Sequence, residues 1–498
     1  MKRLLSLATL MVSAGVYADV AYDVTVDPTA GTLHVKVQFP KADNGLRIQI
    51  PNWAPGSYRL ADTFKNVQNF KATSATGTAL TTNVEMTTTP KTYGDGADRK
   101  TIQNPICTWV VGGAPTVVVE YDLNMKPVDG ALNWSGPSTY IYAVDRLKEA
   151  CTLSVHLPTG WSAYTGLDPK GSSATEFVAP DYDVLADNPV STGDVTVDTY
   201  VSRGKTHTIV MRGKAREKVD RAYLIKACKF VTDAETDFFG GKAPYNRYVW
   251  HFSVNDAADG AGGLEHLSST QISLAAGVGP RAVSVLAHEF FHLWNVKRIR
   301  SSVLGPFDYT KLPETGAIWW LEGVTDYYSH TFLYRYGWWT EDAYFKDAVS
   351  NVNTVRRNPA HTEISPYDSS LRVGEASEGR GNSNGYKISY YNQGWVVGML
   401  LDIEMRAQTN GRRSLDDVEH ALWDLCKDNK PGFQEDEIRK QLVRFGGAPM
   451  GAFYDQIILK PGDMIDQTLA KAGLRLFDKP ENYTEWASPG SPIRCRAW

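Results

Sequence analysis

Apolar and polar residues alternate in short runs through residues 19–198 of the chain. Examples are LHVKVQF (33–39), LRIQI (46–50), TVVVEYDL (116–123) and CTLSVHL (151–157), and Gly, Pro and Asn separate such runs. A period of two residues is typical of strands with one buried face, and turn residues between the runs favour antiparallel connections. The pattern therefore predicts an antiparallel β domain over residues 19–198.

Beyond residue 198 the apolar period lengthens. After a last strand pair, a long helix is predicted at 218–241 and a strand at 248–254, and SSTQISL (268–274) alternates like an edge strand. From residue 341 the pattern is mainly helical, with a long polar loop at 358–385 as a candidate rim or lid. These periods predict a multidomain α+β protein, with an α/β domain over 199–340 and a helical part over 341–475.

The segment SVLAHEFFHLWNVKRIR (284–300) carries the most constraining pattern. Apolar residues recur at helical spacing, and Pro280 can open the helix because its first turn does not use the missing N–H. His288 and His292 then lie on one helical face and can bind a single zinc ion, with Glu289 directed at a metal-bound water. The motif alone is also compatible with a core helix that carries two histidines by chance.

A second apolar stretch, IWWLEGVTDYYSHTFLYRYG (318–337), supplies a candidate third ligand. A catalytic zinc is commonly bound by two histidines and one carboxylate, and Glu322 lies on a predicted helix that Gly337 can end. Asp326, one turn later, can accept the outer N–H of a zinc-bound histidine. The alternative, a solvated acidic face, fits poorly with the surrounding aromatic residues.

Two further stretches offer candidate substrate contacts. Gly262 and Gly263 allow a close approach of the backbone to a ligand, and an edge strand beside them could bind an extended peptide. Glu265 would face one end of that peptide, although its spacing alone favours a surface glutamate in a turn. In SYYNQGWVVGML (389–400), Tyr390 or Tyr391 could donate a hydrogen bond to an oxyanion, or both could be buried aromatic residues.

Taken together, GGLEH, HEFFHLWNVKRIR, PFDY and WWLEGVTDYY resemble the glycyl aminopeptidase family of gluzincin (HEXXH...E) zinc metallopeptidases. IPNWAPGSYRLAD (50–62) and YDVLADNPVSTGD (182–194) extend the resemblance upstream. It implies a thermolysin-like catalytic domain. Family members usually continue into a PDZ domain, whereas residues 476–498 here predict an irregular tail.

The resemblance also assigns roles to particular residues. It implies one Zn²⁺ per chain bound by His288, His292 and Glu322, and Glu289 as general base. It further implies that Glu265 binds the substrate α-amine and that Tyr391 stabilises the transition state. In the related enzymes a lysine usually stands where this chain has Gln393.

The predicted function is therefore a zinc-dependent aminopeptidase that hydrolyses the N-terminal residue of peptides. A preference for Gly or Ala is implied by the family name alone. One alternative is a zinc metalloendopeptidase, if Glu265 points away from the cleft. Another is a non-catalytic periplasmic peptide-binding protein with a vestigial zinc site, which the intact base Glu289 disfavours.

Composition fits an exported globular enzyme. The 498 residues are 42% hydrophobic and 22% charged with a net charge of −4, which gives no signature of nucleic-acid binding. The basic run 297–300 is interpreted as a structural feature of a helix C-terminus. Residues 1–18 predict a signal peptide and export to the bacterial periplasm, without stable membrane insertion. The oligomeric state stays open.

Five cysteines form no paired zinc motif. In an oxidising compartment, Cys107 and Cys151 are the one candidate pair for a disulfide, and buried free thiols are the alternative.

Overall fold

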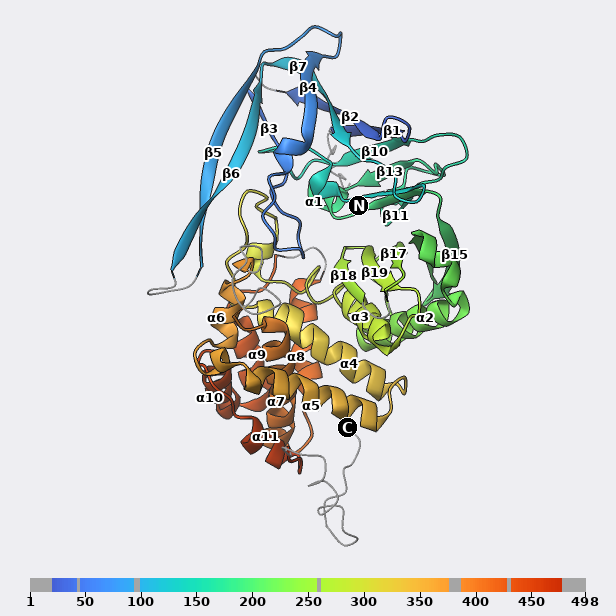
Figure 1. Cartoon of the computed structure of the whole chain (residues 1–498). Coiled ribbons are helices and arrows are strands. Elements are labelled where there is room, and N and C mark those ends of the chain that lie inside the picture. Colours follow the sequence, from blue (N-terminus) through green and yellow to red (C-terminus); the bar gives the residue numbers. More distant parts are fainter. Residues whose placement is uncertain are drawn as a thin grey trace, which may run out of the picture.

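The computed structural model of the protein describes residues 20–42, 45–93, 99–257, 261–375, 387–427 and 431–476. The predicted signal peptide (1–18) and residues 477–498 of the predicted tail lie outside these ranges. A β domain, an α/β part and a helical part follow one another along the chain (Figure 1). This arrangement confirms the predicted multidomain α+β fold class.

The β domain contains one large sheet and two smaller sheets. The large sheet has the order β12 (Asp168–Pro169), β13 (Glu176–Ala179), β10 (Cys151–His156), β1 (Val20–Asp27), β2 (Thr32–Ala42), β7 (Ala114–Asn124) and β4 (Val67–Ser74). The four-stranded sheet has the order β5 (Thr82–Tyr93), β6 (Lys100–Val111), β3 (Leu46–Gln49) and β9 (Tyr142–Ala143). The third sheet comprises β11 (Tyr164–Thr165), β14 (Val190–Gly193) and β8 (Ala131–Trp134), and the helix α1 is Tyr182–Ala186.

The alternation seen in the sequence becomes the inner face of this domain. Along β2, Leu33, Val35, Val37 and Phe39 are buried while the residues between them are partly exposed. The pairing of β1 with β10 is parallel, whereas β1 with β2 and β2 with β7 are antiparallel. Antiparallel pairing with one buried face is the arrangement that a period of two residues predicts.

The candidate disulfide between Cys107 and Cys151 is wrong. Cys107 lies on β6 in the four-stranded sheet and Cys151 on β10 in the large sheet, and neither thiol forms a disulfide. Both side chains are buried, and burial raises the pKa of the Cys107 thiol. Their apolar surroundings make Cys107 and Cys151 core residues of the β domain.

The α/β part is a five-stranded sheet with helices packed beside it. The strand order is β15 (Thr196–Ser202), β16 (Lys205–Arg212), β17 (Arg247–Asn255), β19 (Ser269–Ala275) and β18 (Ala261–Glu265). Helices α2 (Arg221–Phe238) and α3 (Pro280–Phe291) pack against each other. Because β15 begins at Thr196, the strand starts before the expected domain boundary at residue 198.

The strand predicted for SSTQISL exists, but the prediction that it lies at the edge of the sheet is wrong, because it is the second strand from the edge. SSTQISL forms β19, which pairs parallel with β17 on one side and antiparallel with β18 on the other. The edge is β18, which contains Gly262, Gly263 and Glu265. Glycines have no side chain, so β18 lacks the alternation of apolar and polar residues by which a strand is recognised, and it could not be predicted from the sequence.

The helical part starts with a π-helical turn, η6 (Trp319–Val324), that runs directly into α4 (Thr325–Arg335). It continues through α5 (Glu341–Arg357), α6 (Pro366–Leu371), α7 (Tyr390–Thr409), α8 (Leu415–Cys426), α9 (Glu437–Gly446), α10 (Ala448–Ile457) and α11 (Ile465–Lys471). Short 3₁₀ turns occur at η1 (Thr63–Asn66), η3 (Gly136–Ser138), η4 (Lys214–Lys218), η5 (Ser302–Leu304) and η7 (Pro359–Thr362).

The predicted polar loop at 358–385 is wrong in its first half. Residues 359–371 contain η7 and α6, and Asn358 and Ser365 each accept a hydrogen bond that caps one of these turns. Residues 376–385 lie outside the described ranges. Within the described chain, none of the helices combines the length and the apolar character that a membrane span requires.

Candidate metal and peptide-binding site

Three buried side chains converge where α3 ends against η6. The Nε2 atoms of His288 and His292 lie 2.8 Å apart, and Glu322 Oε2 lies 3.5 Å from the first and 3.3 Å from the second. All three ligand atoms are within 4.8 Å of one another. Two atoms that bind one tetrahedral zinc ion lie about 3.4 Å apart, so the donor set and its spacing fit a single small cation.

Helix geometry and a pair of glycines bring the third group to the histidines. His288 and His292 are one helical turn apart on α3 and at its end. Glu322 lies within the π-helical turn, a distortion often found at functional sites. A Cβ atom at Gly394 of α7 would lie 2.1 Å from the Trp319 carbonyl oxygen, and one at Gly323 would lie 2.4 Å from the Gly394 Cα. These glycines allow η6 and α7 to touch through their backbones.

Each histidine has a partner on its outer ring nitrogen. His288 Nδ1 lies 2.8 Å from Asp326 Oδ1, and His292 Nδ1 lies 2.7 Å from the Asn295 carbonyl oxygen. With Nδ1 donating to these oxygens, both Nε2 atoms are left to bind a metal. The Asp326 contact is the one expected from sequence. The Asn295 contact uses a main-chain oxygen, which no side-chain pattern could reveal.

The two acids of the cluster have opposite electrostatic surroundings. Burial opposes ionisation of Glu322, but His292 and His288 outweigh it and hold its pKa at about 2. For Glu289, burial raises the pKa to about 7, although the same histidines act against this increase. A carboxylate that is ionised throughout suits a metal ligand, whereas one that titrates near neutrality suits proton transfer.

Glu289 lies between the His288–His292–Glu322 cluster and the edge strand β18. It is buried, and its Oε2 receives no hydrogen bond from the described residues. A Cβ atom at Gly263 of β18 would lie 2.2 Å from the Glu289 Cδ, so only a glycine fits beside this carboxylate. Gly262 and Gly263 are themselves exposed, which leaves this strand open on the side of the cluster.

Glu265 stands at the end of β18 and is not a surface residue. Only 4% of it is exposed, and its Oε1 is buried with no hydrogen-bond partner among the described residues. Lys297 Nζ lies 3.7 Å from this oxygen and 3.0 Å from Asp187 Oδ1. The interpretation of Glu265 as a turn residue, left open from spacing alone, is therefore wrong.

The basic run 297–300 also has a different place from the one expected. Helix α3 ends at Phe291, so the run lies beyond it rather than in its last turn. Lys297 is buried beside two carboxylates, and Arg298 donates to the carbonyl oxygens of Leu293 and Pro244 at 2.7 and 2.8 Å. Lys297 and Asp187 were missed as candidates because they are brought to this place from different segments of the chain. His266, next to Glu265 in the sequence, was missed because its partner Asp187 is distant in the sequence.

Of the two candidate tyrosines, Tyr391 is the one whose ring lies near a histidine of the cluster. Its centroid is 6.0 Å from that of His288, and the residue is half-buried. Tyr390 is buried in the core, with its ring 4.9 Å from that of Tyr391. The contact between η6 and α7 thus places the first turn of α7 beside the histidines.

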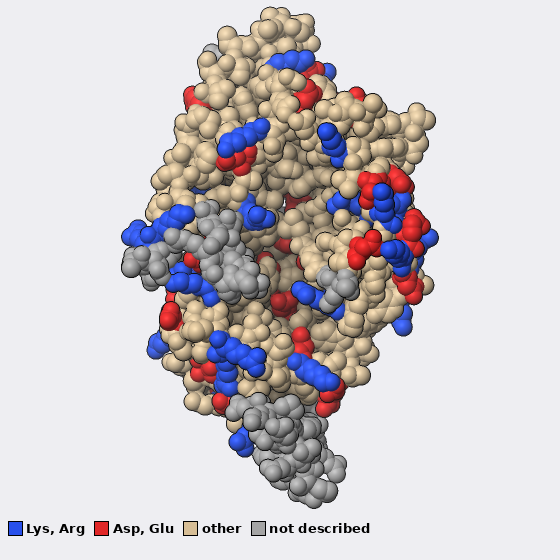
Figure 2. Space-filling view, viewed as in Figure 1, with Lys and Arg blue, Asp and Glu red and all other residues tan. Residues whose placement is uncertain are grey.

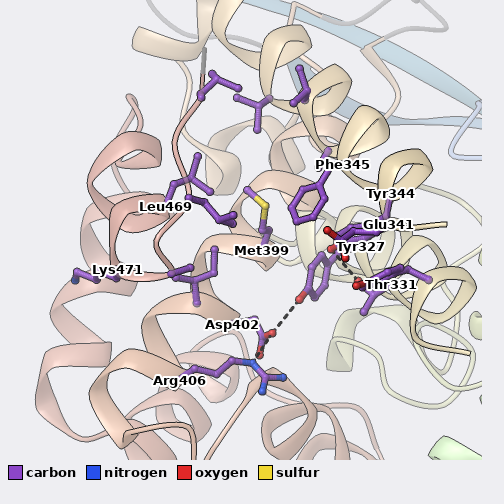
Figure 3. A pocket seen from close by; sticks show the side chains of 18 of the residues that line it. Tyr327, Thr331, Glu341, Tyr344, Phe345, Met399, Asp402, Arg406, Leu469 and Lys471 are labelled. Carbon is purple, nitrogen blue, oxygen red and sulfur yellow. Dashed lines mark hydrogen bonds and ion pairs between the residues drawn. The ribbon is translucent and has the colours of Figure 1, made fainter. Parts of the chain in front are cut away.

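The space-filling view shows a hollow between the β domain and the helical part, with acidic side chains visible in its depth (Figure 2). A separate cavity of about 650 Å³ lies within the helical part (Figure 3). Tyr327, Asp402 and Arg406 line it, and Asp402 Oδ2 accepts hydrogen bonds from both of the others at 3.0 and 2.9 Å. His288, Glu289, His292 and Glu322 do not line this cavity.

Comparison with known protein families shows which class of protein this chain belongs to. The family model of the M61 glycyl aminopeptidase matches residues 281–397 of the sequence. The family model of the M61 peptidase N-terminal domain matches residues 21–194. The protein is thus a peptidase. The two matched ranges contain the histidine motif, Glu322, Tyr391 and both upstream motifs, and the chain belongs to the M61 glycyl aminopeptidase family.

Solved structures share the fold. An aminopeptidase N family protein from Idiomarina loihiensis is 22% identical, with a TM-score of 0.80 over 91% of this chain and 78% of that chain. Yeast LTA4 hydrolase, solved in complex with bestatin, is 12% identical, with a TM-score of 0.50 over 90% of this chain and 68% of that chain. No curated protein matches the sequence significantly.

Proposed function

We propose that this peptidase is a zinc-dependent aminopeptidase that releases the N-terminal residue of peptides. The observation that carries the proposal is the buried His288–His292–Glu322 cluster, with ligand atoms within 4.8 Å of one another, beside Glu289 and the open strand β18. Two imidazoles, one carboxylate and room for water form a recurrent catalytic zinc site. A bound zinc ion would polarise the scissile carbonyl and lower the pKa of water.

Side chains of the protein carry out the other steps of the reaction. Glu289 takes the proton from the attacking water and later delivers it to the leaving amine, for which a pKa near 7 is well matched. The phenol of Tyr391 donates a hydrogen bond to the oxyanion that develops on the substrate carbonyl. Asp326 and the Asn295 carbonyl orient the two histidines.

Strand β18 and Glu265 account for exopeptidase specificity. An extended peptide can add to the exposed edge at Gly262 and Gly263, which carries the scissile bond past Glu289. At the end of this strand, Glu265 Oε1 has no hydrogen-bond partner among the described residues and can accept one from the substrate α-ammonium. Cleavage would then follow the first residue. The family name supports a preference for Gly or Ala.

An endopeptidase is the second candidate, and one observation favours it. Lys297 Nζ lies 3.7 Å from Glu265 Oε1, so Glu265 already has a cation nearby without a substrate amine. The two functions differ in their response to a blocked N-terminus. An aminopeptidase requires the free ammonium, whereas an endopeptidase cleaves the acetylated peptide equally well.

The test compares free and N-acetylated peptides, together with alanine para-nitroanilide, before and after removal of metal. We expect cleavage of free-amine substrates only, loss of activity with a strong chelator, and recovery with about one zinc per chain. His288→Ala should lose the metal, while His156→Ala on the exposed end of β10 should retain it. Full activity in metal-free protein would contradict the zinc proposal, and equal cleavage of acetylated peptides would replace it with the endopeptidase.

A further inference from the structure

One loop of the β domain reaches the carboxylate of Glu265, and a second reaches Lys297 beside it. Gly56, with φ of +90°, is so close that a Cβ atom there would lie 2.6 and 2.7 Å from the two Glu265 oxygens. Asp187, directly after α1, lies in the other loop. Both residues belong to upstream motifs of the sequence, 50–62 and 182–194, that the metal chemistry does not use. The wall around Glu265 is therefore built by both domains.

Asp187, Lys297 and Glu265 form a buried row of charges, each with 4 to 5% of the residue exposed. Lys297 Nζ lies 3.0 Å from Asp187 Oδ1 and 3.7 Å from Glu265 Oε1, so the ammonium is closer to Asp187. Asp187 Oδ2 also accepts a hydrogen bond from the Leu267 backbone N–H at 2.9 Å, and His266 Nδ1 lies 3.1 Å from Oδ1. Burial alone would raise the pKa of Asp187, but Lys297 and His266 hold it below its usual range.

The charges of this row leave one negative charge for a ligand. The two carboxylates and the one ammonium of this row sum to −1. A substrate α-ammonium beside Glu265 would bring the charge of this row to zero, which a water-poor site favours. Without Asp187, the lysine would pair with Glu265 directly and cancel the charge that the substrate requires.

We propose that Asp187 and Lys297 are positioning residues for the substrate amine: Asp187 holds the Lys297 ammonium away from Glu265, and Lys297 compensates the charge of Asp187, so that the Glu265 carboxylate is left to bind the substrate. The proposal rests on the function proposed above, in which Glu265 binds the α-ammonium. It assigns to the β domain a direct part in recognising the free N-terminus of a peptide.

The test is a double-mutant cycle on zinc-loaded enzyme, with kcat and KM for alanine para-nitroanilide. Asp187→Asn keeps the shape and an oxygen that accepts from Leu267, and we expect KM to rise about tenfold or more with a smaller change in kcat. Lys297→Met leaves two buried carboxylates without a cation and should be similarly impaired. The double variant retains the single charge of Glu265, and its KM should return toward that of the parent.

A merely structural role predicts a different result. If Asp187 and Lys297 only join the domains, the double variant should be at least as impaired as the worse single variant. Tyr309→Phe is the matched control, since it removes a buried 2.8 Å hydrogen bond from the Tyr309 hydroxyl to Asp183 without touching Glu265. It should lower the melting temperature and leave KM unchanged. A KM increase in this control equal to that of Asp187→Asn would overturn the proposal.

Glu265→Gln separates failure of this proposal from failure of the aminopeptidase function. Should Glu265→Gln leave the KM for free-amine substrates unchanged, the amine anchor itself is wrong. When Glu265→Gln raises KM but Asp187→Asn does not, the anchor stands and the positioning role is rejected. Asp187→Asn alone, which preserves the hydrogen bond from Leu267, decides this even if the double variant fails to fold.

Discussion

Glu289 has the surroundings of a proton acceptor rather than of a structural carboxylate. It is 5% exposed, one of its oxygens lacks a hydrogen bond from the described residues, and burial raises its pKa to about 7. Leaving a buried carboxylate oxygen unsatisfied is costly, so such a group is usually kept for a function. His288 and His292 beside it have their Nδ1 atoms occupied, which leaves both Nε2 atoms for a metal.

Glu289→Gln tests this difference. The amide has nearly the same shape but cannot accept the proton from water, so kcat should fall by about 10² to 10⁴. The zinc content and the melting temperature should stay close to those of the parent, as measured by metal analysis and thermal unfolding. Release of zinc with unchanged activity per bound ion would show instead that Glu289 is a ligand.

Tyr391→Phe tests the assignment of the oxyanion donor. Because this hydrogen bond forms mainly in the transition state, kcat should fall by roughly 10² with little change in KM. Tyr390→Phe is the neighbouring control and should have a mild effect, since that ring is buried away from His288. The opposite ranking of the two variants in steady-state kinetics would transfer the role to Tyr390.

At the level of elements, the close contact of η6 with α7 carries the geometry of the site. Trp319–Val324 and the first turn of α7 approach through Gly323 and Gly394, where a Cβ atom meets backbone atoms at 2.1 to 2.7 Å. Backbone atoms cannot rotate away as a long side chain can. Any larger residue must therefore separate the element bearing Glu322 from the element bearing Tyr391.

Gly394→Ala should lower both stability and turnover. The added methyl group forces α7 away from the Trp319 carbonyl, at a cost of about 1–3 kcal/mol, and moves Tyr391 relative to His288. Gly398→Ala, one turn later, meets the Val324 side chain at 3.2 Å and should be close to neutral. Thermal unfolding and kcat measured on both variants would check this, and equal effects would contradict the argument.

The elements that could be predicted from sequence are those with local signals. The spacing of His288, Glu289 and His292 on one helix needs no knowledge of the fold, and Gly337 has the positive φ of +80° expected at a helix end. The order of β18 and β19 in the sheet depends on long-range pairing, which neither segment encodes by itself. For the same reason Asp187, 110 residues before Lys297, could not be recognised as its partner.

On the scale of the whole molecule, the β domain holds the segment that joins α3, with the two histidines, to η6, with Glu322. The Asn52 N–H donates to the Tyr309 carbonyl oxygen at 2.9 Å, and the Trp53 indole donates to the Asp308 carbonyl oxygen at 2.8 Å. Asp183 of α1 accepts from the Tyr309 hydroxyl. The PFDY motif therefore serves as a docking segment between the domains.

Global stability should decrease with rising pH because of Glu419 on α8. This side chain is fully buried, and burial raises its pKa to about 8 although the Trp320 indole acts against this increase. Unfolded Glu419 ionises near 4.5. The folded state therefore holds a proton that unfolding releases between pH 4.5 and about 8, so its contribution to the free energy of unfolding falls through that window.

Glu419→Gln removes this ionisation and should be stabilised relative to the parent at pH 8 but not at pH 4.5. The gap should widen by up to about 1.4 kcal/mol per pH unit within the window. Urea unfolding of both proteins across this range measures it. Parallel stability curves would show that Glu419 has a partner in solution that keeps it ionised.

The contact between Asp187 and Lys297 has a consequence for how this enzyme family can vary. Each residue lies in a different domain, and each is buried where the other supplies the compensating charge. A change on one side without the other leaves an unpaired charge in the interior, which proteins rarely tolerate. Among relatives, positions 187 and 297 should therefore change together. Chimeras that combine the β domain of one relative with the peptidase portion of another should be active only when the residues at positions 187 and 297 carry opposite charges or are both uncharged.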